Sequence, residues 1–163
     1  MKRKVPVILS ALLAAGITVT PAMTAEAAPA FNPYNTIQAE AKFGGEGIEV
    51  TTEESGAKVV SSIDEGDYFY VKDINFSNGL SKITISAKTD SFAVIDVRKG
   101  GVDGESLGNI KLTNTNGEYK EFSATMKNVD GKEALSFVGA KGSCSIDYWT
   151  AEAATTAEPT PNP

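Results

Sequence analysis

The feature of this sequence that most constrains its fold is a succession of short segments in which apolar and polar residues alternate. The segment Leu80–Ala87 alternates cleanly, and Phe92–Arg98 is apolar enough to cross the core of a sandwich. Turn signals rich in Gly, Asn and Asp separate the segments, for example at 77–79, 100–104 and 114–117. No run has a helical period. The pattern predicts roughly nine or ten strands in an all-β antiparallel sandwich or barrel.

The two ends of the chain differ from this middle part. The chain begins with the basic residues 2–4, an apolar stretch over 5–19 and the small-x-small sequence Ala25-Glu26-Ala27, which together are typical of a secretory signal peptide. The apolar stretch is shorter than the roughly 20 residues of a membrane span. We expect cleavage after Ala27 and therefore a secreted, extracellular protein.

Residues 28–150 have the length of one ordinary domain. Residues 151–163 are rich in Ala, Thr, Glu and Pro, a composition that cannot bury a core. The sequence therefore predicts a single module followed by a disordered tail or a truncated linker.

Composition excludes several classes of function. The net charge of −6 argues against nucleic acid and anionic membranes as partners. The absence of His excludes a Ser-His-Asp triad and a His-bound zinc. Carboxylate pairs such as Glu53–Glu54 are expected on the solvated surface, so we predict no enzymatic activity. The single Cys144 cannot form an internal disulfide and is expected to be buried.

Three oxygen-bearing side chains suggest a metal site. Asp147 lies in the predicted last strand, Cys144–Trp149, where it is expected on the same face as Trp149, and a carboxylate among apolar residues needs a hydrogen-bond partner or a metal. Gln38 and Glu40 are two residues apart and so project from one face of the first strand. If the first and last strands are neighbours, these groups with one or two backbone carbonyls suit calcium. The alternative is that Gln38 and Glu40 are the solvent face of an edge strand.

Five motifs in order resemble the family 6 carbohydrate-binding modules, to which families 35 and 36 are related. The resemblance spans about residues 31–151, and its motifs are 37–40 (IQAE), 47–50 (GIEV), 62–68 (SIDEGDY), 117–122 (GEYKEF) and 146–149 (IDYW). The family implies a β-sandwich of the jelly-roll type with a structural calcium ion. Its ligands would map to Gln38, Glu40, Asp147 and a main-chain oxygen near Lys58.

The family also implies a sugar-binding cleft at one edge of the sandwich. The apolar C–H face of a sugar stacks on flat rings there, and its hydroxyl rim needs polar partners. Tyr119 falls at the position of the family's stacking Trp, Ser62 at that of the opposing Tyr, and Ser145 at that of the sugar-binding Asn. Some members of the family bind glycans on a sheet face instead, whereas we expect Tyr68 and Tyr70 to pack in the core or sheet.

The resemblance thus implies a non-catalytic module for plant-wall β-glycans such as xylan, whose partners are a poly- or oligosaccharide and a catalytic module outside this chain. The replacement of two of the three site residues by Ser leaves an alternative open. In this alternative the chain is a structural or protein-interaction module that keeps the fold and has lost sugar binding.

Overall fold

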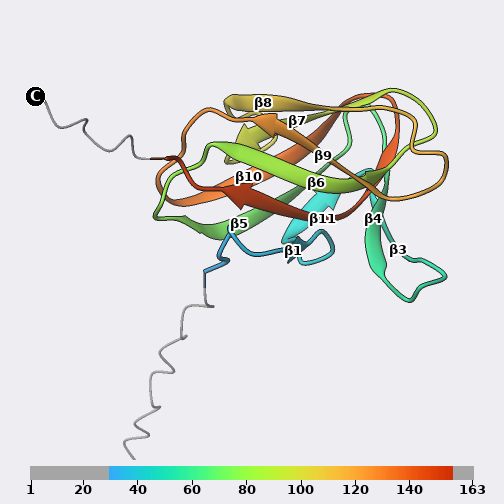
Figure 1. The fold of residues 1–163 in the computed structure, drawn as a ribbon, viewed down its shortest axis with the longest axis horizontal. Helices are drawn as coiled ribbons and strands as arrows, with labels where there is room; N and C mark the ends of the chain where they lie inside the picture. The colour runs from blue at the N-terminus through green and yellow to red at the C-terminus, as the bar shows by residue number, and fades with distance from the viewer. Residues whose placement is uncertain (1–29, 156–163) are drawn as a thin grey trace, which may run out of the picture.

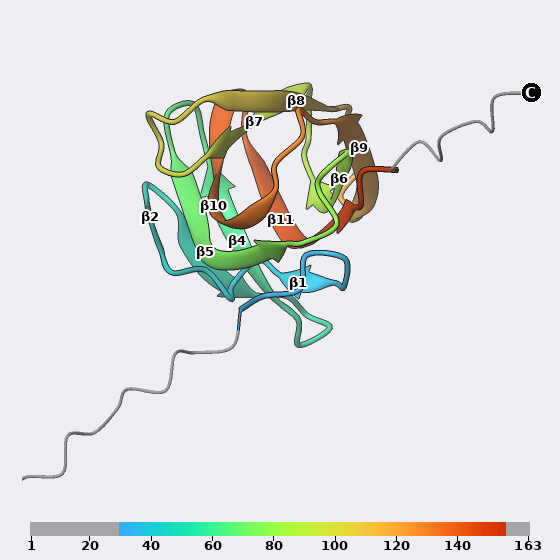
Figure 2. The ribbon, with the colours of Figure 1, turned by 90° about the vertical axis from the view of Figure 1, so that its left-hand side faces the viewer.

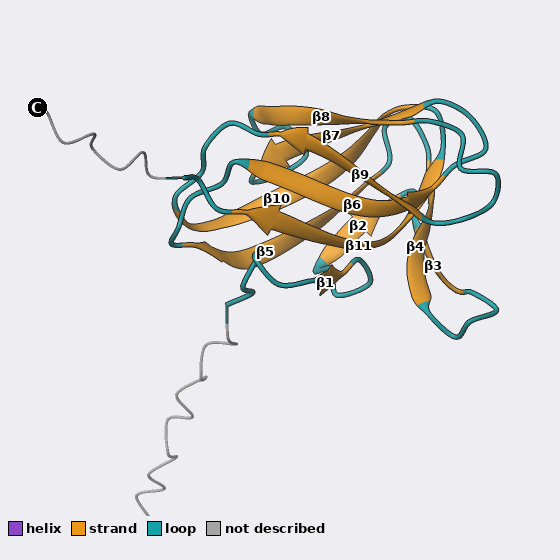
Figure 3. Cartoon of the chain, viewed as in Figure 1, coloured by secondary structure: helices purple, strands orange, loops and turns teal. Residues whose placement is uncertain are grey.

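The computed structural model describes residues 30–155, and within this range the chain is built from strands and loops without any helix (Figures 1 and 3). It accordingly holds no helix long and apolar enough to cross a membrane. The predicted signal peptide over residues 1–27 and the end of the predicted tail, 156–163, lie outside the described residues. The strands pair antiparallel in two sheets, which confirms the predicted all-β class.

One sheet contains the last strand of the chain in its middle. Its strands follow the order β3-β4-β11-β6-β9, and β1 pairs with the C-terminal half of β11. The bounds are β1 Ile37–Gln38, β3 Glu49–Thr52, β4 Lys58–Ile63, β6 Lys82–Lys88, β9 Lys120–Thr125 and β11 Cys144–Glu152. The register Ile37↔Trp149 and Gln38↔Tyr148 makes the first and last strands neighbours, as the metal hypothesis requires.

The second sheet has the order β2-β5-β10-β7-β8 and covers the first (Figure 2). Its strands are β2 Gly44–Glu46, β5 Tyr68–Phe76, β7 Ala93–Lys99, β8 Ser106–Leu112 and β10 Gly131–Lys141. Strands consecutive in the sequence lie in different sheets at several points, for example β4 and β5, or β10 and β11. Such crossing connections between two facing sheets define the jelly-roll sandwich.

Three aromatic rings join the two sheets. Phe69 of β5 stacks on Phe137 of β10 with a centroid distance of 4.8 Å, and Phe137 contacts Trp149 of β11 at 5.3 Å. All three side chains are fully buried. Each buried large apolar side chain stabilises a fold by about 1.5–3 kcal/mol, so this cluster contributes to the stability of the packing between the two sheets.

A β-bulge in β11 changes the expected orientation of Asp147 and Trp149. Against β6, Ile146 pairs with Ala87 and Tyr148 with Ser86, so Asp147 is an extra residue in its strand. Regular alternation would place Asp147 and Trp149 on one face. The bulge shifts the phase, so that Trp149 is buried in the core while Asp147 turns out of it. The prediction that Trp149 lies beside Asp147 on one face is therefore wrong.

The last strand is longer than its sequence pattern predicts. β11 runs to Glu152, two residues beyond the predicted end of the module at residue 150, and Ala151 is buried. The Ala151 N–H donates to the Pro33 carbonyl at 2.7 Å, and the Ser81 N–H donates to the Glu152 carbonyl at 2.9 Å. These main-chain bonds order the segment whatever its side chains are, and composition carries no signal for them.

Candidate functional site

The end of β1 brings two of the predicted metal ligands together. The Ala39 N–H donates to the Asp147 carbonyl at 2.8 Å, so the chain just after β1 follows the bulge of β11. The Oε2 atom of Glu40 is buried there without a hydrogen-bond partner. Burial first, and then the nearby carboxylates of Glu40 and Glu53, raise the pKa of Asp147 above its ordinary value. A cation would relieve both the orphaned oxygen and this repulsion, so the residues present fit a metal ion.

The other two predicted ligands are the side chain of Gln38 and the main-chain oxygen of Lys58, and the structure supports them less strongly. Gln38 is exposed, and it shares the side of Glu40 because Ile37 and Ala39 between and beside them are buried. Lys58 is exposed at the start of β4. Within residues 30–155, no three His, Cys, Asp or Glu residues form a group that could hold a metal. An ion at this place would therefore depend on two carboxylates together with neutral oxygens.

The predicted sugar-stacking residue, Tyr119, lines a cleft of about 350 Å³. The ring is partly buried just before β9. Its lining comes from the turn before β4, from β4, β6 and β11, and from the segment before β9: Glu53, Glu54, Ser55, Ala57, Val59, Lys88, Gly117, Glu118, Tyr119 and Asp147. Tyr119 and Asp147, which the sequence connects with different functions, thus line the same cleft.

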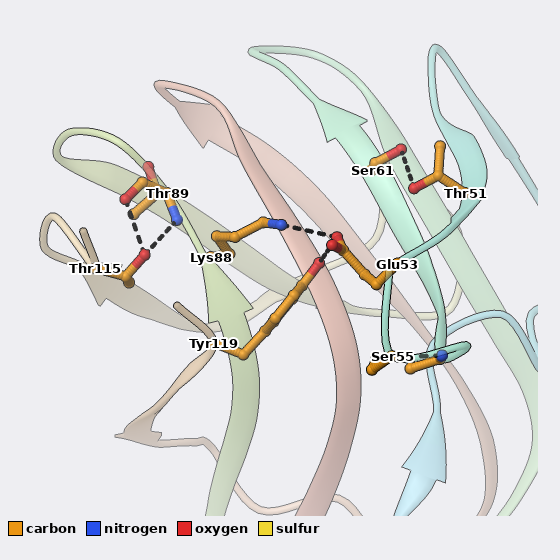
Figure 4. Close-up of polar contacts among 9 residues, drawn as sticks. Thr51, Glu53, Ser55, Ser61, Lys88, Thr89, Thr115 and Tyr119 are labelled. Atoms are coloured by element: carbon orange, nitrogen blue, oxygen red, sulfur yellow. Dashed lines mark hydrogen bonds and ion pairs between the residues drawn. The ribbon is translucent and has the colours of Figure 1, made fainter. Parts of the chain in front are cut away.

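Lys88, Glu53 and Tyr119 form a polar cluster in this cleft (Figure 4). The Tyr119 hydroxyl donates to Glu53 Oε1 at 2.9 Å, and the Lys88 ammonium donates to the same oxygen at 2.8 Å. Lys88 Nζ also lies 4.8 Å from the centroid of the Tyr119 ring, in a cation–π contact. The hydrogen bond from Lys88, and next that from Tyr119, lower the pKa of Glu53. Burial, followed by the Glu53 carboxylate, raises the pKa of Tyr119.

The two serines predicted at the site have different positions. Ser145 lines a second hollow of about 180 Å³, which shares Lys88 with the Tyr119 cleft. Ser62 is exposed and has a φ of 57°, at a bulge where Ser61 and Ser62 together oppose Ser145. Ser62 lines neither hollow. The structure therefore brings Tyr119 and Ser145 to neighbouring hollows and leaves Ser62 outside them.

Sequence reasoning missed Glu53 and Lys88. Glu53 was expected to be one of a solvated pair with Glu54, yet its side chain is only 30% exposed and accepts two hydrogen bonds. Its partners lie 35 and 66 positions away in the sequence. No local pattern carries such a signal, because the three residues meet only when β6 and the segments before β4 and β9 assemble.

A second aromatic surface lies on the outer face of the other sheet. Tyr68 and Tyr70 alternate with the buried Phe69 and Val71 and therefore point away from the core; of the two expected placements, core or sheet, the structure shows the sheet. They line a groove of about 390 Å³ with Lys72, Gly100, Gly101, Val102 and Ala134. The ring of Tyr70 lies over β2, where a Cβ on Gly44 would approach its Cε1 atom to 2.8 Å. A larger residue at position 44 would require the Tyr70 ring to shift.

A two-layer β-sandwich with a ring-lined, charged cleft at its edge is an architecture of sugar-binding modules. The model of the family described as carbohydrate binding module (family 6) matches residues 38–153, and the chain belongs to this family. Its relatives include an endo-1,4-β-xylanase A of Thermoclostridium stercorarium, which is 31% identical over 120 residues, or 71% of this chain and 18% of the xylanase. A second endo-1,4-β-xylanase A of that organism is 28% identical over 120 residues and is matched over 23% of its length. The chain thus spans about a fifth of the length of these relatives.

Solved structures support the fold. A β-1,3-glucan-binding family 6 module of Bacillus halodurans has a TM-score of 0.70 and 26% identity, covering 76% of this chain and 99% of that one. A family 6 module of Clostridium stercorarium in complex with cellobiose has a TM-score of 0.73 and 24% identity, covering 77% and 98%. A family 36 module in complex with calcium and xylotriose has a TM-score of 0.56 and 14% identity, covering 72% and 99%. The jelly-roll sandwich predicted from the sequence is confirmed.

Proposed function

We propose that this chain is a secreted, non-catalytic module that binds a β-glycan, with xylan-type chains first, in the Tyr119 cleft. The observation that carries the proposal is the partly buried Tyr119 ring in a cleft whose rim offers both hydrogen-bond donors and acceptors. A sugar needs these two features, a flat apolar surface and a polar rim. The xylanase relatives and the cellobiose- and glucan-binding neighbours support a β-glycan as the ligand.

The module would act by holding a catalytic module close to its polymer. The xylanases are matched over only a small part of their length, which supports a role as one module among others. Attachment to a polymer raises the local concentration of a linked enzyme without any new contact. No reducing-sugar release from xylan, arabinoxylan, mixed-linkage glucan or laminarin is expected from this chain alone.

Affinity gel electrophoresis tests the proposal. Native gels containing each of these four polysaccharides are run with calcium present, and retardation by xylan is expected. Tyr119→Ala should abolish the retardation, whereas Phe92→Ala, which removes an exposed ring outside both hollows, should leave it unchanged. Retardation by none of the polymers would contradict glycan binding and favour a structural or protein-interaction module. Retardation unchanged in Tyr119→Ala would move the site to the Tyr68–Tyr70 groove.

We also propose that a structural calcium ion lies between the end of β1 and the bulge of β11. Glu40 and Asp147 would hold it, with Gln38 and the main-chain oxygen of Lys58 completing the set. When bound, the ion would neutralise two neighbouring carboxylates and tie the first strand to the last. The buried Oε2 of Glu40 and the raised pKa of Asp147 support the proposal, and the calcium-bearing family 36 neighbour agrees with it.

A further inference from the structure

The Tyr119 cleft already holds one ammonium group, which belongs to the chain itself. Lys88 Nζ lies 4.8 Å from the centroid of the Tyr119 ring and 2.8 Å from Glu53 Oε1 (Figure 4). An aromatic face attracts a cation through its quadrupole, and a carboxylate adds a charge-assisted hydrogen bond. The same pair of contacts is used to recognise cationic ligands. The cleft therefore contains the chemistry of an ammonium-binding site.

The charge of the lining exceeds what Lys88 can neutralise. Two further carboxylates, those of Glu54 and Glu118, line the cleft beside Glu53, and neither is a proposed calcium ligand. Of these three acids, Glu53 alone has an ion-pair partner within residues 30–155. The hollow on the other side of Lys88 adds Asp90. Because these charges share a concave surface, they favour a positively charged ligand over a neutral or an acidic one.

We propose that the Tyr119 cleft selects a sugar that carries an amine, of the glucosamine type, over its neutral counterparts. The inference rests on the proposed glycan binding at the same site. Xylan-type chains remain the expected ligand among neutral glycans, and the amine sugar is expected to bind more tightly than they do. The C–H face of such a sugar would lie in the ring-lined cleft, and its ammonium would pair with a carboxylate that Lys88 leaves free. The hollows on either side of Lys88 give space for more than one sugar unit.

Isothermal titration calorimetry with three small probes tests the selectivity. The probes are the β-1,4-linked trimer of glucosamine, its fully N-acetylated form and xylotriose, measured on the full chain at one fixed salt concentration. The amine trimer is expected to bind at least about tenfold tighter than the acetylated trimer, which has the same backbone without the charge. Equal affinities for the two trimers would overturn the inference and leave glycan binding intact. If no probe binds and no polysaccharide retards the chain, the proposed function itself is wrong.

Two matched charge variants show whether the effect belongs to the cleft. Glu118→Gln removes an exposed carboxylate of the lining, and Glu46→Gln removes an equal charge from β2 in the other sheet. Glu118→Gln should weaken binding of the amine trimer about threefold and leave the acetylated trimer unaffected, while Glu46→Gln changes neither. The same weakening in both variants would show that only the net charge of the protein matters, and would overturn the inference.

Replacement of Lys88 is expected to strengthen binding of the amine trimer, whereas Glu118→Gln is expected to weaken it. Lys88→Met keeps the length and apolar stem of the side chain and vacates the ammonium position over Tyr119. The amine trimer is then expected to bind about threefold tighter, because its ammonium can take the contacts to the ring and to Glu53. Weaker binding of the amine trimer to Lys88→Met would show that Lys88 serves the sugar directly, and would contradict a site for a ligand ammonium.

Discussion

The Tyr119 cleft and the Tyr68–Tyr70 groove are similar in size, at about 350 and 390 Å³, and differ in what surrounds their rings. The ring of Tyr119 is covered by the Lys88 ammonium and bonded to Glu53. The two tyrosines of the groove lie instead beside a glycine-rich loop, the apolar side chains of Val102 and Ala134, and one charged side chain, Lys72. Charged side chains thus dominate the lining of the cleft, whereas the groove offers mainly flat apolar surface.

The ion pairs beside the two hollows differ in the same way. In the cleft, the Lys88 and Glu53 side chains are 27% and 30% exposed. Near the groove, Arg98 pairs with Asp96, whose side chain is only 9% exposed, and Arg98 also donates to the Val102 carbonyl at 2.9 Å. The second pair thus holds a groove-lining loop in place. In the first pair both side chains are partly exposed, whereas in the second only Arg98 is, at 34%, and Asp96 is nearly buried.

Calcium removal should have the largest effect, and only on the cleft side. With calcium at a hundred times its Kd, binding stabilises the fold by about 2.7 kcal/mol, so a chelator should lower the wild-type Tm by several degrees. Hydrogen exchange should accelerate in β1 and β11 and stay unchanged in β7 and β8, next to the groove. Asp147→Ala serves as the control, since its Tm should not respond to the chelator. An unshifted wild-type Tm would exclude the ion.

The two ion pairs should differ in their contribution to stability. Arg98→Met leaves the nearly buried Asp96 with Ser106 as its remaining hydrogen-bond donor, and is expected to cost about 2–3 kcal/mol. Lys88→Met breaks a pair that solvent screens, and should cost less than about 1 kcal/mol. Urea unfolding of both variants measures the difference. Equal losses of unfolding free energy in the two variants would mean that the Lys88–Glu53 pair stabilises the fold as much as the Arg98–Asp96 pair does.

The two tyrosine surfaces should differ in sugar affinity. Tyr119→Ala is expected to weaken binding to xylan at least about tenfold, because a stacking surface and a rim hydroxyl are lost together. Tyr70→Ala removes a ring of similar size from the groove and should change the affinity less than about twofold. Calorimetry with soluble xylan measures both. The reverse order would assign sugar binding to the sheet face.

The smallest expected effect is the change in stability with pH that the Asp147 carboxylate causes in the metal-free protein. Its pKa is raised by burial and by Glu40 and Glu53, so the folded state binds the proton more tightly than the unfolded chain. This carboxylate therefore destabilises the fold progressively as the pH rises through its folded-state pKa. Asp147→Asn should be slightly more stable than wild type at neutral pH with chelator, and the advantage should vanish below the ordinary pKa of Asp. Urea midpoints at pH 3.5 and pH 7 provide the comparison.

The all-β antiparallel class could be predicted from alternation and turns because these are local properties of the chain, whereas the jelly-roll type was implied only by the resemblance to the family. The buried state of Cys144, whose pKa burial raises to about 12, follows equally from its residue type. The proximity of Glu40 and Asp147 was accessible through the pairing of the first and last strands. The meeting of Glu53 and Lys88 with Tyr119 depends on three segments far apart in the sequence, and the bulge at Asp147 has no signature in residue type.

In a regular strand, the alternation that buries Ile146 would also fix the orientations of Asp147 and Trp149. The bulge at Asp147 removes this constraint. Ile146 and Trp149 are both buried although they are three residues apart, an odd spacing that strict alternation forbids. The side chain of residue 147 therefore does not follow the inward–outward alternation of its strand. A substitution at residue 147 can therefore leave Ile146 and Trp149 buried and the register of the core unchanged, so this partly exposed position can vary without refolding of the sandwich.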